Sequence, residues 1–238
     1  MKLGLVQTLL DLKARKQQVA LVTELATGTQ DLYYDGHPAP TLGLSATARD
    51  QVQALIAADR SEEVALDGKD CFVQVHNPTP RLIIIGAVHI SQALAPMAAT
   101  AGYEVIVVDP RRSFATDARF PGVTLDGAWP DEAMEKLKPD IRTAVVTLTH
   151  DPKLDDPALS AALRSPAFYI GALGSKKTHA ARIGRLTRAG FADNDIARIH
   201  GPAGLDIGAK SPAEIAVSVL AQLTAARRGR QTQRVGPG

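Results

Sequence analysis

Polar and charged residues follow directly after four apolar segments in the second part of the sequence. They are Gly86 and His89 after 81–85, Asp109, Arg111 and Arg112 after 104–108, His150 and Asp151 after 143–148, and Gly171, Gly174, Ser175, Lys176 and Thr178 after 167–170. Imidazoles, carboxylates, hydroxyls and cations together can hold a polar, anionic ligand. Each residue alone also has a structural interpretation, as a turn glycine, a loop cap or a hydrogen-bonded histidine. One shared site therefore requires a fold that brings the four groups together.

Residues 171–178 predict an anion-binding turn. Glycines let backbone N–H groups approach a ligand closely, and a helix that begins near Ser175 adds the positive end of its dipole. Ser175 and Thr178 would add hydroxyl groups and Lys176 a positive charge. In the alternative interpretation the glycines only form the turn and the lysines face water. The Gly-x-x-x-x-Gly-Lys-Ser/Thr spacing is absent, which argues against hydrolysis of nucleoside triphosphates.

The turn after 81–85 departs from the dinucleotide-binding pattern. Gly-x-Gly-x-x-Gly would place glycines where the chain has Val88 and Ser91. Asp109 stands where an acid would bind a ribose diol, whereas Arg111 and Arg112 beside it suit a phosphate. These two features argue against NAD(P) as the cofactor of this domain.

The order of apolar and helical segments predicts how these groups meet. Apolar stretches at 81–85, 104–108, 123–125, 143–148 and 167–170 alternate with helical stretches at 89–101, 131–137, 155–164 and 175–189. Strands that are apolar along their whole length must be covered on both faces, and crossover helices provide that cover. The sequence therefore predicts an α/β fold with a Rossmann-like doubly wound parallel sheet. Ligands of such sheets bind outside the carboxyl ends of the strands.

A small N-terminal α/β unit is predicted before this domain, at residues 1–76. A helix at 3–16, strands at 19–25 and 31–34, a helix from Ser45 to Ala58 and strands at 62–66 and 70–75 are expected. Prolines at 78 and 80 mark the link to the Rossmann-like domain, expected at 81–226. Residues 227–238 contain four arginines and are expected to form a flexible basic tail.

Composition limits the class of protein. Of 238 residues, 45% are hydrophobic and 22% are charged, with a mean hydropathy of −0.04, as in ordinary globular proteins. No apolar run approaches the roughly 20 residues that cross a bilayer, and no signal-like stretch follows Met1, so we expect no membrane contact and a cytoplasmic location. The net charge of +2 provides no broad basic face for nucleic acid. Cys71 is the single cysteine, and we expect it to be a buried, inert thiol.

Several of these segments carry a resemblance to a known family. Gly86-Ala87-Val88-His89-Ile90, Val107-Val108-Asp109-Pro110-Arg111, Leu148-Thr149-His150-Asp151 and the stretch 169–175 are followed by Gly201-Pro202-Ala203-Gly204-Leu205-Asp206 and Pro212-Ala213-Glu214. In this order, over about residues 81–225, they resemble the C-terminal Rossmann domain of the XdhC/CoxI accessory family. Val88 is a departure, because many members have glycine there.

The resemblance implies a function. Members of this family assist the maturation of xanthine dehydrogenase and related molybdenum hydroxylases: they bind molybdenum cofactor (molybdopterin), support its sulfuration and hand it to the apoenzyme. It implies a chaperone, often a homodimer, whose partners are an apo molybdenum hydroxylase and a cysteine desulfurase. The expected cofactor contacts are the groups named above, with Gly174 and Ser175 at the phosphate, Asp109, Asp151 and Asp206 at the pterin, and His89 or His150 near the metal.

Two other classes of protein stay open. One is an NAD(P)-dependent oxidoreductase, which would bind its cofactor at the same sheet edge. Asp109 supports this class of protein, and Val88 argues against it. A scaffold that joins a hydroxylase to a sulfur donor would leave the polar strand ends unexplained. A metal site built from His89, His150, His179 and nearby aspartates is a further alternative without cysteine ligands. We assign no metal ligand and no catalytic residue from the sequence.

Overall fold

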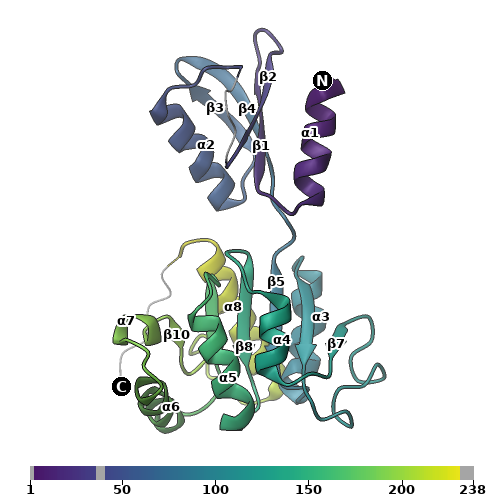
Figure 1. Ribbon diagram of the computed structural model, residues 1–238, viewed down its shortest axis with the longest axis vertical. Coiled ribbons are helices and arrows are strands. Elements are labelled where there is room, and N and C mark those ends of the chain that lie inside the picture. Colours follow the sequence, from purple (N-terminus) through teal and green to yellow (C-terminus); the bar gives the residue numbers. More distant parts are fainter. Residues whose placement is uncertain (1–2, 36–40, 231–238) are drawn as a thin grey trace. The chain divides into compact units, whose positions relative to one another are not determined.

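The computed structural model describes residues 3–35 and 41–230. The chain divides into two compact units, Met1–Pro78 and Thr79–Gly238, joined by the proline-flanked link that the sequence contains at 77–80 (Figure 1). Each unit has its own buried core and is described separately.

The N-terminal unit is a four-stranded antiparallel sheet with a helix on each face. Its elements are α1 (Leu3–Ala14), β1 (Val19–Glu24), β2 (Gln30–Tyr34), α2 (Ala46–Ala58), β3 (Glu62–Leu66) and β4 (Lys69–His76), with strand order β2-β1-β4-β3. Alternate residues of β1 divide the two faces, since Ala20 and Val22 pack with α2 while Val19 and Leu21 pack with α1. Cys71 is buried on the α2 side, and burial raises the pKa of its thiol, as expected for an unreactive cysteine.

The second unit is a parallel sheet of the Rossmann type. Its strands are β5 (Arg81–Ile85), β6 (Glu104–Val108), β7 (Thr124–Asp126), β8 (Thr143–Thr147), β9 (Tyr169–Ala172) and β10 (Ile199–His200). The strand order is β10-β9-β8-β5-β6-β7, and all neighbours are parallel. The chain therefore starts in the middle of the sheet and winds outward in both directions, which confirms the doubly wound α/β prediction.

Helices cover both faces of this sheet (Figure 1). They are α3 (His89–Thr100), α4 (Pro130–Leu137), α5 (Pro152–Leu163), α6 (Lys176–Arg188), α7 (Asp193–Ile196) and α8 (Pro212–Arg227). Apolar residues of α3 and α8 pack in one core with Leu82 and Ile84, whereas residues of α4, α5, α6 and α7 pack in another with Ile83 and Ile85. Successive residues of β5 thus face opposite cores, which is why that strand is apolar throughout.

Two features of this unit differ from the sequence prediction. The fifth strand was expected at 167–170, but β9 extends to Ala172, because Gly171 and Ala172 pair with Val146 and Thr147 of β8. Parallel pairing here overrides the weak strand propensity of glycine and alanine. The elements after 189, namely α7, β10 and α8, were not predicted.

Helix α8 also includes the first residue of the expected basic tail. Arg227 is its last residue, and its guanidinium carbon lies 5.3 Å from the centre of the Tyr103 ring. Residues 231–238 of that expected tail lie outside the described residues. No helix in the described part of the chain is long and apolar enough to cross a bilayer.

Two buried tyrosines provide a test of the second unit's core. The hydroxyl of Tyr169 donates a 2.7 Å hydrogen bond to Gln222 on α8, whereas the buried hydroxyl of Tyr103 has no hydrogen-bond partner among the described residues. We expect Tyr169→Phe to lower the free energy of unfolding by about 1 kcal/mol, and Tyr103→Phe to leave it unchanged or raise it. Urea denaturation of both variants measures this difference. Equal losses in the two variants would contradict the assignment of the Tyr169–Gln222 hydrogen bond.

Candidate functional site at the carboxyl edge of the parallel sheet

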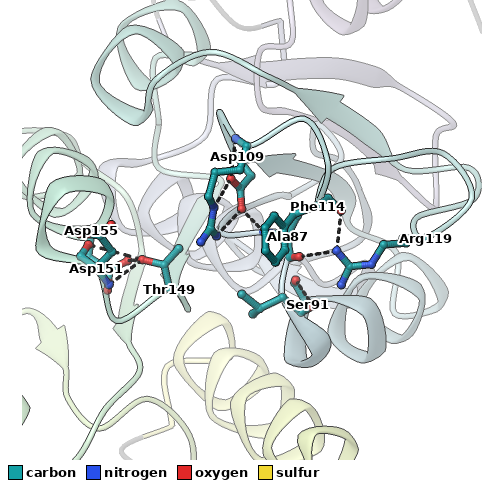
Figure 2. A network of polar contacts seen from close by, with 10 residues as sticks. Ala87, Ser91, Asp109, Phe114, Arg119, Thr149, Asp151 and Asp155 are labelled. Carbon is teal, nitrogen blue, oxygen red and sulfur yellow. Dashed lines mark hydrogen bonds and ion pairs between the residues drawn. The ribbon is translucent and has the colours of Figure 1, made fainter.

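The fold brings the four polar groups of the sequence to one edge. Strands β9, β8, β5 and β6 are consecutive neighbours in the sheet and run parallel, so the turns after them are adjacent. Figure 2 shows Ala87 and Asp109, from the turns after β5 and β6, in one view with Thr149, Asp151 and Asp155, from the turn after β8 and the start of α5. The site is built from contacts between these turns.

The turns after β5 and β8 are in direct contact. Gly86 has φ +109°, and a Cβ atom there would lie 2.5 Å from Cγ2 of Thr149. Only glycine combines this backbone conformation with such a close approach. Gly86 therefore shapes the turn, and the contact that it permits is with the protein's own Thr149.

Asp109 joins the turns after β5 and β6. Its carboxylate is fully buried and accepts hydrogen bonds from the backbone N–H of Ala87 at 2.8 Å and of Arg111 at 2.9 Å. The Arg111 guanidinium adds two more, from Nε at 2.9 Å and Nη2 at 2.7 Å. Burial opposes the charge on this carboxylate, but the hydrogen bonds from Arg111 and Ala87 outweigh it and hold the pKa of Asp109 below its usual value.

This geometry gives Asp109 the structural role of a loop cap, which the sequence analysis held as its alternative interpretation. An ionised carboxylate has about four lone-pair positions, and four hydrogen bonds from the protein occupy them. The acceptor positions that the sequence analysis assigned to a pterin or a ribose are thus used by contacts within the protein. Arg111, in contrast, keeps an outward edge, because its side chain is 38% exposed.

The loop after Arg111 is held against the same turn by Arg119, which the sequence analysis did not single out. Its guanidinium donates to the carbonyl oxygens of Ala87 at 3.0 Å and Phe114 at 2.7 Å (Figure 2). It also donates to the side chain of Gln92 on α3 at 2.9 Å. Phe114 stays 42% exposed in this loop, with the guanidinium carbon of Arg111 4.6 Å from its ring centre. The signal in the sequence was weak, because arginines and phenylalanines at 111–120 have no characteristic spacing.

A second buried carboxylate, also not predicted, lies under the turn after β8. Oδ1 of Asp155 accepts a 2.7 Å hydrogen bond from Thr149, whose Oγ1 in turn accepts one from the backbone N–H of Asp151 at 3.0 Å. Oδ2 of Asp155 is 3.8 Å from Nη2 of Arg182, too far for a hydrogen bond, and that nitrogen donates to the carbonyl oxygen of Leu173 at 2.8 Å. Asp155 thus holds the turn after β8 through Thr149, and Arg182 holds the turn after β9 through Leu173.

Burial dominates the electrostatics of this pair. Both side chains are about 2% exposed. Loss of hydration raises the pKa of Asp155 and lowers the pKa of Arg182, and their mutual attraction does not reverse either shift. Two polar atoms of the pair, Asp155 Oδ2 and Arg182 Nε, have no hydrogen-bond partner among the described residues.

The turn before α6 has the geometry of a helix start with its cap in place. Ser175 is the N-cap, and its Oγ accepts a 3.1 Å hydrogen bond from the backbone N–H of Thr178. Gly174 has φ +138°, and a Cβ there would lie 3.1 Å from Thr178. Lys176 is exposed at the first position of α6. Ser175 and Thr178 are therefore engaged with each other, and Lys176 is available to an anion.

Gly171 serves the sheet in this structure. It lies inside β9, and a Cβ would meet the ring of Tyr169 at 2.8 Å. The glycine makes room for the tyrosine within the strand. The approach of a ligand to the backbone at Gly171 and Gly174 stays a prediction.

The remaining expected site residues are exposed on this edge or next to it. They are His89 at the start of α3, Arg112 after β6, His150 and Asp151 after β8, and Asp206 in the segment after β10. Asp151 caps α5 by accepting a 2.9 Å hydrogen bond from the backbone N–H of Lys153, and His150 has φ +64°. Within the described residues, no group of three or more histidine, cysteine and acidic side chains is placed to hold a metal ion.

Comparisons with known proteins agree with this architecture. Residues 82–223 match the model of the XdhC Rossmann domain family, and the chain belongs to this family. Of its curated relatives, the uncharacterised protein YqeB of Escherichia coli K12 is 36% identical over 66% of the chain. A probable xanthine dehydrogenase subunit of Bacillus subtilis is 35% identical over 66%, and the molybdenum cofactor insertion chaperone PaoD of E. coli K12 is 33% identical over 63%.

A solved structure extends the similarity to the whole chain. The crystal structure of a xanthine dehydrogenase from Bacillus halodurans matches 99% of this chain and 68% of its own, with a TM-score of 0.67 and 25% identity. The curated relatives are longer, since the matches cover 30%, 46% and 41% of YqeB, the B. subtilis protein and PaoD. The resemblance noted in the sequence is therefore confirmed at the level of the family.

The two buried aspartates should respond to pH with opposite signs. A carboxylate with a lowered pKa stabilises the fold above its unfolded pKa, near 3.8, and loses that contribution as the pH falls through its folded pKa. A carboxyl with a raised pKa contributes its stability below 3.8 and loses it as the pH rises through its folded pKa. Wild type should therefore gain stability relative to Asp109→Asn as the pH rises towards 3.8, and lose stability relative to Asp155→Asn as the pH rises above 3.8. Urea denaturation at several pH values measures both slopes, and slopes of the same sign would refute this description.

Proposed function

We propose that this protein binds molybdenum cofactor at the carboxyl edge of its Rossmann sheet and delivers it to an apo molybdenum hydroxylase related to xanthine dehydrogenase. The observation that carries the proposal is the convergence of the turns after β5, β6, β8 and β9 in a chain of the XdhC family. The name of PaoD, a molybdenum cofactor insertion chaperone, supports the same cargo. The cofactor is cargo here, so the protein needs groups that hold it and release it.

The exposed groups at this edge fit an anionic, polar cargo. Lys176 at the start of α6 and the outward edge of Arg111 offer positive charge to a phosphate. Helix α3 begins at this edge, in the turn after β5, and no side chain caps the N–H groups of its first turn. His89 and His150, both exposed, are the candidate hydrogen-bond donors for the oxygen or sulfur ligands of the metal.

The family role suggests further steps that belong to the proposal. The protein would hold the cofactor while a cysteine desulfurase supplies the sulfido ligand, act as a homodimer and work in the cytoplasm. The names of the xanthine dehydrogenase-related relatives support a molybdenum hydroxylase as the client.

The cargo can be tested by release and by variants on one helix. Protein purified from cells that make molybdenum cofactor is denatured under oxidising conditions, and the released pterin is measured by its fluorescence. We expect Lys176→Ala to lower the pterin content about threefold to tenfold, because it removes a charge at the helix start. Arg188→Ala is the matched control, since Arg188 is exposed in the last turn of the same helix. Absence of pterin from the wild-type protein would contradict the proposal, and equal losses in both variants would contradict the assigned place of the phosphate.

The histidines distinguish a chaperone from a catalyst. If His89 and His150 only orient the cargo, His89→Gln and His150→Asn keep one polar contact each and should retain part of the ability to activate an apo hydroxylase. A histidine that transfers a proton has no amide substitute, and its loss lowers a rate by about 10²–10⁴-fold. Reconstitution of hydroxylase activity measures the first property, and an NAD(P)H oxidation assay on the protein alone measures the second. Turnover of NAD(P)H by wild type that either variant abolishes would overturn the chaperone assignment.

A further inference from the structure

The carboxylate that would bind the ribose of a dinucleotide at this edge already accepts hydrogen bonds from other groups of the protein. In Rossmann domains the carboxylate at the end of the second strand accepts hydrogen bonds from the ribose hydroxyls of the adenosine half. Asp109 stands at this position, directly after β6, next to the central strand β5. Its side chain is 0% exposed, and Arg111 and two backbone N–H groups use its acceptor positions. A ribose diol therefore finds neither access nor a free acceptor there.

The loop after β6 adds a side chain beside this carboxylate. In the view of Figure 2 Phe114 lies between Asp109 and Arg119, and one nitrogen of Arg119 donates to the carbonyl oxygens of both Phe114 and Ala87. The guanidinium carbons of Arg111 and Arg119 lie 4.6 Å and 5.8 Å from the centre of the Phe114 ring, distances at which a cation interacts with an aromatic face. Arg119 also fixes the backbone of the loop, since it donates to the carbonyl oxygens of both Phe114 and Ala87. The aromatic ring is thus held next to the turn where an adenosine would begin.

We propose that Arg111 and Phe114 are specificity-determining residues that close the adenosine half of this Rossmann edge. Adenine dinucleotides such as NADH are excluded, because their ribose contact and the space beside it are taken by the chain itself. The outward edge of Arg111 stays accessible to a compact anionic ligand. This inference deepens the proposed function and rests on it only for the kind of ligand that is admitted.

The first experiment uses the wild-type protein and NADH. Titration followed by nicotinamide fluorescence should give no saturable binding up to about 1 mM NADH, the upper end of the usual range for enzyme substrates. Saturable binding below this concentration overturns the inference. It would leave the pterin measurement on purified protein unaffected, so this failure and a failure of the proposed function are distinguishable.

The second experiment removes side chains at the adenosine half of the site and compares two matched triple variants. Both carry Phe114→Ala and Val88→Gly, the latter because a valine in that turn would crowd a pyrophosphate whatever Arg111 does. One adds Arg111→Ala, which frees the carboxylate of Asp109, and the other adds Arg112→Ala, which removes an equal charge from the exposed neighbouring residue. We expect the variant without Arg111 to bind NADH at least about tenfold more tightly, the effect of restored hydrogen bonds to a charged acceptor. Equal affinity in the two variants contradicts the inference.

A milder variant keeps the experiment informative if Arg111→Ala does not fold. Arg111→Lys, in the same background, retains a cation near Asp109 but cannot form the paired hydrogen bonds of a guanidinium. It should bind NADH with an affinity between those of the two triple variants, and circular dichroism verifies that each protein is folded. An affinity no higher than that of the Arg112→Ala variant again contradicts the inference.

Discussion

The buried carboxylate of Asp109 is the point on which the polar edge of the sheet depends. Its backbone N–H donates to the carbonyl oxygen of Asp126 at the end of β7, and its side chain binds Ala87 after β5 and Arg111 in its own loop. Three chain segments are therefore joined at Asp109, two of them through its carboxylate and one through its backbone. A charge with no exposure is tolerated in a protein only when hydrogen bonds surround it, so the position of Arg111 follows from that of Asp109. The loop that carries Phe114 and Arg119 is in turn anchored by Arg111.

The edge contains two kinds of polar residue with different tasks. Asp109, Thr149, Asp155 and Arg182 are buried or bonded to one another, and they fix the turns. His89, Arg112, His150 and Lys176 are exposed and free of that structural task in the contacts described above. The division suits the proposed function, because the groups that hold the turns need not change when a ligand binds or leaves.

Much of this fold could be predicted from the sequence, and the reason is physical. Apolar strands such as 81–85 and 143–147 have few alternatives to a parallel sheet covered on both faces, and that sheet determines where the polar residues after them must meet. Burial was harder to predict. Asp155 and Arg182 lie on different helices, 27 positions apart, and nothing in their local sequence shows that the fold removes both from water. The end of β9 was misplaced for a similar reason, because its last residues are strand residues only through their pairing with β8.

The contact between Gly86 and Thr149 limits how this family of sequences can vary. The methyl group of Thr149 occupies the space that a side chain at position 86 would need, although the two residues lie in different turns. A larger residue at 86 requires a smaller one at 149, and the positive φ of Gly86 allows such an exchange only rarely. Substitutions at these two positions should therefore be coupled through evolution, and this coupling needs no contact of either residue with a ligand. In an alignment of relatives, the pair would be recognised by its joint change rather than by the chemistry of either side chain.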